Sequence, residues 1–185
     1  MAQENLGDHM GELNKVIACM KEFGKKSKVD DFQDKLVIQK VVCLLELLDF
    51  DMNYKFSMYV RGPYSPDLTA DLYQNKEKVE SLKSDYVFSN KEKSLITKVA
   101  QTSNNFEPAM LEIMATYTFL VQKKSLSSRD ATMELKKIKS FYSESKIAVG
   151  LSRAKQLFPP TEKQVEEMKA EFADFEDAAL SDMKY

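Results

Sequence analysis

The chain has 185 residues, of which 43% are hydrophobic and 30% are charged, with a formal net charge of -2. This composition fits a single domain with a sizeable core and differs from that of disordered chains. No segment approaches the ~20 consecutive apolar residues of a membrane span. The polar and acidic residues 1–9 do not form a secretory signal. We therefore expect a cytoplasmic protein without a membrane partner.

Apolar residues at helical spacing predict two helices in the first part of the chain. The first is expected after a loose tail of about ten residues and should cover residues 13–23, with Gly24 ending it. The second runs from about residue 32 to residue 48 and is apolar on so many sides that we place it in the middle of the domain. Cys19 and Cys43 lie among apolar neighbours on these helices, so we interpret them as buried free thiols.

A strand, a tight turn and a capped helix are predicted in the next segment. Residues 54–60 alternate aromatic or apolar residues with others, as a half-buried strand does, and Gly62-Pro63 is expected to end that strand. Ser65 is a suitable N-cap for a new helix, Pro66 suits the first helical position, and Asp67 favours the positive end of the helix dipole. All local patterns in this segment agree.

The following segments predict further helices and little strand. Residues 85–88 are the candidate second strand and are expected to pair with residues 54–60. Ser89 and Glu92 form a capping box that opens a helix reaching about Ala100. Further helices are expected to begin after Asn104-Asn105, after Ser127 or Ser128, and after Ser143.

Pro159-Pro160 is the clearest boundary in the sequence. Beyond it, Thr161 and Gln164 form a second capping box for a helix that should reach about Leu180. This helix carries a narrow apolar seam between charged flanks, formed by Val165, Met168, Phe172 and Phe175. The seam either docks on the preceding domain or binds another chain, with a homodimer as one form of the second alternative.

The predicted fold class is therefore mainly α. Residues 1–158 are expected to form a single compact helical domain with one short β-hairpin or strand pair. Residues 159–185 are expected to form a C-terminal amphipathic helix.

The sequence offers little catalytic chemistry. His9 is the only histidine and lies in the expected tail, which argues against Ser–His and Cys–His pairs and against ordinary zinc sites. The five glycines form neither a phosphate-binding loop nor a dinucleotide fingerprint. The neighbouring carboxylates Asp30-Asp31 and Asp49/Asp51 are typical of loops and helix caps. We therefore predict that the protein is not an enzyme and has no catalytic residues, metal site or cofactor.

The turn around Arg61 is the candidate binding site. Free backbone donors at the N-terminus of the following helix could hold an anion beside Arg61, although Asp67 already supplies negative charge there. A rigid scaffold turn is the alternative. Tyr59 and Tyr64 are either rim aromatics or ligand contacts. The candidate partner-binding residues are Tyr59, Arg61, Tyr64 and Ser65, and we expect the first three to be at least partly exposed.

Charge is unevenly distributed in the C-terminal third of the chain. Residues 123–155 contain nine basic and three acidic residues, whereas residues 161–185 contain eight acidic residues and three lysines. Two solvated helix faces explain this difference, and attraction between the two regions, within one chain or between chains, is the alternative. A basic helical region also suggests nucleic-acid binding, but the overall charge balance argues against it.

Two segments resemble the YwgA-like proteins of bacteria and archaea, which are similar to the Panacea (SocA-like) domain of many antitoxins. The segments are the KLVIQKVVCLL helix of residues 35–45 and the stretch 59–72, which contains Gly-Pro-Tyr-Ser-Pro. Residues 111–116 and 135–139 are also similar, and the resemblance covers roughly residues 33–157. Cys43 stands where such proteins commonly have an aromatic residue.

This resemblance implies a non-enzymatic helical domain that, in some members, neutralises a toxin or adapts a protein for degradation. Together with the absent catalytic motifs, it leads us to predict a protein-interaction module, antitoxin-like or adaptor-like, whose partner is another protein such as a toxin. The alternative is a nucleic-acid-binding or regulatory protein that uses the basic helices of residues 123–155.

Overall fold

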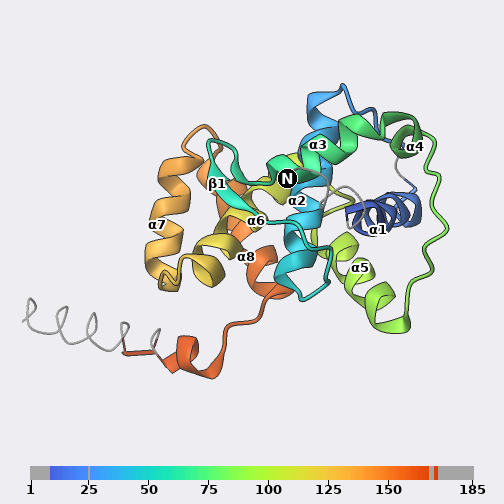
Figure 1. Cartoon of the computed structure of the whole chain (residues 1–185). Helices are drawn as coiled ribbons and strands as arrows, with labels where there is room; N and C mark the ends of the chain where they lie inside the picture. Colours follow the sequence, from blue (N-terminus) through green and yellow to red (C-terminus); the bar gives the residue numbers. More distant parts are fainter. Residues whose placement is uncertain (1–8, 25, 167–168, 171–185) are drawn as a thin grey trace, which may run out of the picture.

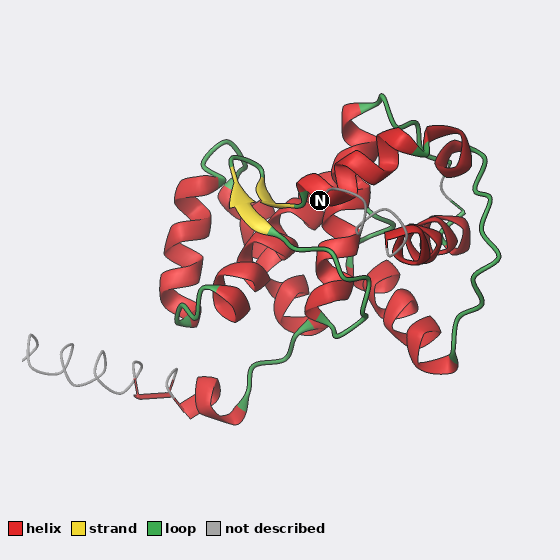
Figure 2. Ribbon diagram, in the orientation of Figure 1, coloured by secondary structure: helices red, strands yellow, loops and turns green. Residues whose placement is uncertain are grey.

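The computed structural model describes residues 9–24, 26–166 and 169–170. The described chain is mainly helical with one two-stranded antiparallel sheet, so the predicted fold class is confirmed (Figures 1 and 2). The elements are α1 (His9–Glu22), α2 (Phe32–Leu47), β1 (Ser57–Tyr59), β2 (Gly62–Tyr64), α3 (Pro66–Gln74), α4 (Lys76–Glu80), α5 (Asn90–Thr102), α6 (Pro108–Lys123), α7 (Ser128–Ile138) and α8 (Glu144–Leu157).

The helices α2 and α6 form the centre of the fold. They pack against each other, while α7 and α8 pack against α6, and α1, α3 and α5 contact α2. Every residue of α6 from Ala109 to Leu120 is buried. A polar side chain buried on such a helix is stabilised only by partners within the protein. The polar residues of α2 and α6 therefore determine what can pack beside them.

Most helix boundaries follow the predicted caps. The side chains of the cap residues accept the expected backbone N–H groups, and both bonds of the capping box between Ser89 and Glu92 are present. Ser127, not Ser128, caps α7. Gly24 follows α1 with φ +63°, a left-handed conformation that glycine adopts without strain. Both cysteines are buried and free, as predicted.

The prediction of the strand pairing was wrong. The strand β1 pairs with β2, in the register Ser57 opposite Tyr64 and Tyr59 opposite Gly62, and residues 85–88 form no strand. The chain reverses immediately after β1, because Gly62 adopts φ +85°. Pro63 fits into β2 since each strand of a two-stranded sheet is an edge strand, where a missing N–H is tolerated.

Two further boundaries and one helix differ from expectation. The first helix already begins at His9, although residues 9 and 10 were expected to lie in the tail. The alternating pattern of residues 54–60 yields a strand only at 57–59. The short helix α4, at residues 76–80, was missed because five residues are too few to show a helical period.

The C-terminal segment is described only in part. Its capping box is confirmed, since the backbone N–H of Thr161 donates to Gln164 Oε1 at 2.9 Å and that of Gln164 donates to Thr161 Oγ1 at 3.3 Å. Residues 162–166 are helical and Val165 is half-buried. The other predicted seam residues, Met168, Phe172 and Phe175, lie outside the described residues, as does the expected helix end near Leu180.

Within the described residues, no helix is both long enough and apolar enough to cross a membrane.

A close contact between α6 and α8 gives a test of this packing. A Cβ atom at Gly150 would lie 2.4 Å from Ile113 Cγ2 and 2.8 Å from Ile113 Cβ. We expect Gly150→Ala to lower the free energy of unfolding by about 1–2 kcal/mol, because the overpacking outweighs the gain of ~1 kcal/mol in helix propensity. Urea denaturation measures this change.

The matched control for this substitution is a double-mutant cycle with Ile113→Ala, which removes the 2.4 Å contact with Cγ2 and so relieves part of the overpacking. The two substitutions should together cost less than the sum of their separate effects. Fully additive effects would contradict the close approach of the two helices.

Candidate functional site

The hairpin formed by β1 and β2 packs against both α2 and α6. At Gly62 the hairpin approaches α6 so closely that a Cβ atom there would lie 2.2 Å from Thr116 Oγ1. Only glycine fits this position, because it tolerates both the positive φ and the close contact. The turn residues Val60 and Arg61 consequently project from the body of the protein, and both are exposed.

Ser65 belongs to the scaffold of this turn. It is fully buried, and its backbone N–H and C=O both bond to the side-chain amide of Gln39 on α2 at 2.9 Å. The amide nitrogen of Gln39 also donates to Thr69 Oγ1 at 2.9 Å. The hydroxyl of Ser65 caps α3 by accepting from the N–H of Leu68 at 3.3 Å. Of the four candidate binding residues, Ser65 therefore has a structural role.

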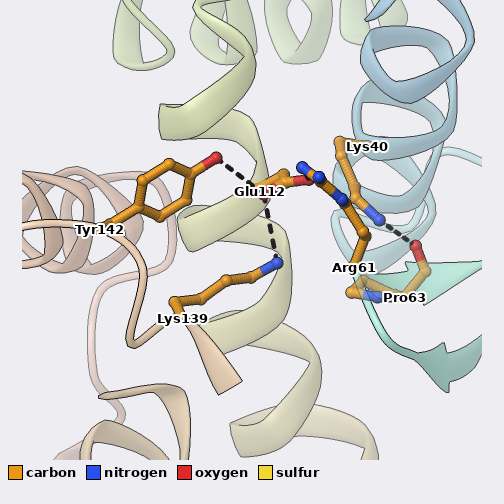
Figure 3. Close-up of polar contacts among 6 residues, drawn as sticks. All are labelled: Lys40, Arg61, Pro63, Glu112, Lys139 and Tyr142. Carbon is orange, nitrogen blue, oxygen red and sulfur yellow. Dashed lines mark hydrogen bonds and ion pairs between the residues drawn. The ribbon is translucent and has the colours of Figure 1, made fainter. Parts of the chain in front are cut away.

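A buried carboxylate lies behind the turn (Figure 3). Glu112 on α6 is fully buried, and its Oε2 accepts from Lys139 Nζ at 3.3 Å and from the Tyr142 hydroxyl at 2.9 Å. Arg61 Nη1 lies 3.5 Å from the other carboxylate oxygen, Oε1. Figure 3 shows Lys139 and Tyr142 on one side of Glu112 and the hairpin with Arg61 on the other side. One carboxylate thus connects α6, the end of α7 and the hairpin.

Positive charge exceeds negative charge around this carboxylate. Lys40 on α2 is buried and donates to the carbonyl of Pro63 at 2.6 Å. Burial lowers the pKa of Lys40 to about 8, with Cys43 opposing and Lys139 adding to this shift. Burial also lowers the pKa of Lys139, and Glu112 opposes that shift. Three cations, Lys40, Arg61 and Lys139, therefore lie near one carboxylate, that of Glu112. The resulting excess of positive charge favours a further negative group near the turn.

Arg61 is held in place while half of its side chain stays exposed. The guanidinium lies 5.3 Å from the ring centre of Phe32 and 5.7 Å from that of Phe141, and both rings are more than half exposed. Together with the ion pair to Glu112, these contacts restrict the guanidinium on several sides. Arg61 therefore presents its remaining N–H donors to solvent in a defined position.

A groove of about 490 Å³ lies beside the turn. We call it the Arg61 groove, and its lining residues include Phe32, Lys35, Lys40, Tyr59, Val60, Arg61, Tyr64 and Tyr73. Its surface is mostly apolar, because aromatic rings from α2, α3 and the hairpin surround it. None of its lining residues is an aspartate or a glutamate, whereas three are cations. The groove therefore combines apolar surface with positive potential.

The expected exposure of the candidate residues is confirmed. Tyr59 is 50% exposed, the Arg61 side chain is 52% exposed, and Tyr64 is half-buried. The rings of Tyr59 and Tyr64 pack edge to face with their centres 5.2 Å apart. The sequence reasoning missed Phe32 and Tyr73, which complete the groove. Phe32 could have been noticed as a large aromatic residue at the exposed first position of an otherwise buried helix.

Much of the basic charge of residues 123–155 is used within the protein. Lys139 is buried, and Arg153 donates to the carbonyl of Thr102 at 2.9 Å. Further cations of this region form ion pairs, namely Lys136 with Glu144, Lys137 with Glu134, and Lys146 with Glu107. This pairing reduces the positive potential that a nucleic acid would meet.

Other chemistry is limited in the part of the chain that the structure describes. There, no group of three or more His, Cys, Asp or Glu residues is placed to hold a metal ion. Burial raises the pKa of Cys43 to about 12, with Lys40 opposing, so this thiol stays protonated at neutral pH. Burial also raises the pKa of Glu46, which accepts the backbone N–H groups of Met52 and Tyr54 and so holds a loop.

The buried ion pair gives a prediction about stability. Glu112→Ala leaves Lys139 buried without its carboxylate, so we expect the free energy of unfolding to fall by about 3–5 kcal/mol. Replacing both partners, as Glu112→Leu with Lys139→Met, should recover most of this loss, because no unpaired charge remains. Urea denaturation measures both changes.

As a control, Lys137→Ala removes an exposed ion pair and should change the free energy of unfolding by less than about 1 kcal/mol. Equal effects for Glu112→Ala and Lys137→Ala would refute the structural role of Glu112.

The lowered pKa of Lys40 gives a prediction about pH. The folded chain releases this proton at about pH 8, whereas the ordinary pKa is 10.5, so between these values the unfolded chain binds more protons. The free energy of unfolding should therefore rise with pH across that window. Relative to Lys40→Met, the wild-type chain should gain up to about 3 kcal/mol as the pH rises through the window. Urea denaturation at a series of pH values tests this, and a pH-independent difference would contradict it.

Comparisons of the chain with protein-family models, with curated proteins and with solved structures found no match. The resemblance to YwgA-like and Panacea proteins therefore stays a prediction.

Proposed function

We propose that this chain is a cytoplasmic, non-enzymatic protein-interaction module, antitoxin-like or adaptor-like, that binds a segment of another protein in the Arg61 groove. One observation carries the proposal. An arginine restrained by a buried carboxylate stands between exposed aromatic rings at the edge of an apolar groove. Arginine and aromatic residues dominate the binding energy of protein interfaces.

The groove needs little rearrangement for binding. Its turn is held against α2 by the hydrogen bond from Lys40 to the carbonyl of Pro63 and by the two hydrogen bonds between Gln39 and Ser65. Arg61 is already restrained before a partner arrives. Side chains that are ordered in advance lose less conformational entropy on binding, so a larger part of the contact energy contributes to affinity.

The composition of the groove indicates the chemistry of the partner. Exposed rings favour an apolar or aromatic side chain, since burying this surface on both sides removes it from water. Lys35 and Arg61, with no carboxylate among the lining residues, favour acidic neighbours of that side chain. The preferred ligand is therefore a segment with apolar anchors flanked by carboxylates. Some members of the family that the chain resembles neutralise a toxin, and a toxin with such a segment is one candidate partner.

Affinity capture from the native host tests the proposal. Phe32→Ala and Tyr59→Ala remove exposed groove residues, and each should weaken binding of the captured partner at least ~30-fold, as expected for interface hot spots. Met133→Ala is the matched control, because Met133 is 47% exposed on α7 and does not line the groove. Titration calorimetry with the purified partner measures the dissociation constants.

Two results would argue against the proposal. If groove and control variants bind the partner equally, the groove is not the binding surface. If the chain is instead retained on DNA in a steeply salt-dependent manner, and Phe32→Ala leaves this retention unchanged, the nucleic-acid alternative is favoured.

A further inference from the structure

The C-terminal segment of the chain itself has the chemistry that the Arg61 groove selects. Residues 161–185 contain eight acidic residues and three lysines, and the apolar seam lies among them. The acidic charge is most concentrated around the aromatic end of the seam. From Glu171 onward, five acidic residues face a single lysine, and they include the neighbours of Phe172 and Phe175. Aromatic anchors flanked by carboxylates match an apolar groove lined by three cations.

The described start of the C-terminal segment lies away from the Arg61 groove of the same chain, which disfavours binding within one chain. In Figure 1, residues 159–166 leave the helical body at the lower edge, below α8, whereas β1 and α3, which border the groove, lie at the upper edge. The capping box at Thr161 and Gln164 starts a helix there. The sequence predicts that this helix continues past Phe175, and a helix of that length covers about 21 Å from Thr161 to Phe175 and cannot fold back on itself. Phe172 and Phe175 would therefore be carried away from the groove of the same chain.

We infer that residues 161–185 bind in the Arg61 groove of a second copy of this chain. The inference rests on the proposed function of the groove as a protein-binding surface. Because each copy has one groove and one C-terminal segment, two copies satisfy each other reciprocally. Reciprocal exchange between two copies leaves no groove or segment unoccupied and gives a closed, symmetric dimer, which is the product we expect. One-way transfer from chain to chain would instead give larger open assemblies and would contradict the dimer.

The mass of the full-length chain in solution tests the inference. Sedimentation velocity should show a species of twice the 21.2 kDa chain mass. Two variants should each raise the dimer dissociation constant at least ~30-fold. The groove variant combines Phe32→Ala with Lys35→Glu, and the segment variant combines Phe172→Ala with Phe175→Ala. Met133→Ala should leave the dimer unchanged. Circular dichroism confirms that every variant is folded.

A mixing experiment separates exchange between chains from docking within one chain. The groove variant keeps an intact C-terminal segment, and the segment variant keeps an intact groove. Mixed in equal amounts, they should form a heterodimer through the one intact contact, although each alone is monomeric. If the mixture stays monomeric, or if the segment variant alone stays dimeric, the inference is overturned.

The outcome also separates this inference from the proposed function. If the wild-type chain is monomeric but Phe32→Ala abolishes binding of the protein partner, the dimer is overturned and the proposed function stands. If neither the mass nor partner binding depends on Phe32, both are wrong. A dimer that depends on the groove and dissociates with rising salt supports the charge complementarity between groove and segment.

Discussion

A buried carboxylate must be neutralised by its neighbours, and Glu112 imposes this requirement at the centre of the fold. It lies on α6, a helix buried along most of its length, so its partners have to come from other elements. Lys139 reaches it from the end of α7, Tyr142 from the following loop and Arg61 from the hairpin. The mutual positions of these three elements therefore depend on one side chain.

The placement of the hairpin determines the shape of the Arg61 groove. With its turn fixed against α6 at Gly62 and against α2 through Lys40 and Gln39, the hairpin keeps aromatic side chains exposed beside Arg61. Exposed rings are unfavourable in water, and buried lysines are unfavourable for the free energy of folding. The exposed rings and the buried lysines therefore lie next to each other in one region of the surface, which is the basis of the proposed binding site.

The cluster beneath the hairpin and the C-terminal segment carry opposite charge. The cluster beneath the hairpin has more cations than carboxylates, and the C-terminal segment has more carboxylates than cations. Such complementarity contributes mainly to association rate and specificity, while the apolar anchors contribute most of the affinity. The two proposals, a segment of another protein and the C-terminal segment of a second copy, therefore concern the same groove.

The sequence by itself determined the features that depend on neighbouring residues: the caps at Ser65, Ser89 and Ser143, the capping box at Thr161 and the central position of α2. Such caps are short-range hydrogen bonds and can be recognised locally. Only the tertiary structure decided that the hairpin closes within residues 57–64, that Lys139 is buried against Glu112, and that Phe32 and Phe141 flank Arg61. The hairpin depends on the fit of Gly62 against Thr116 on α6. The ion pair and the ring contacts join residues far apart in sequence, so the partner of such a lysine or phenylalanine is known only once the helices have packed.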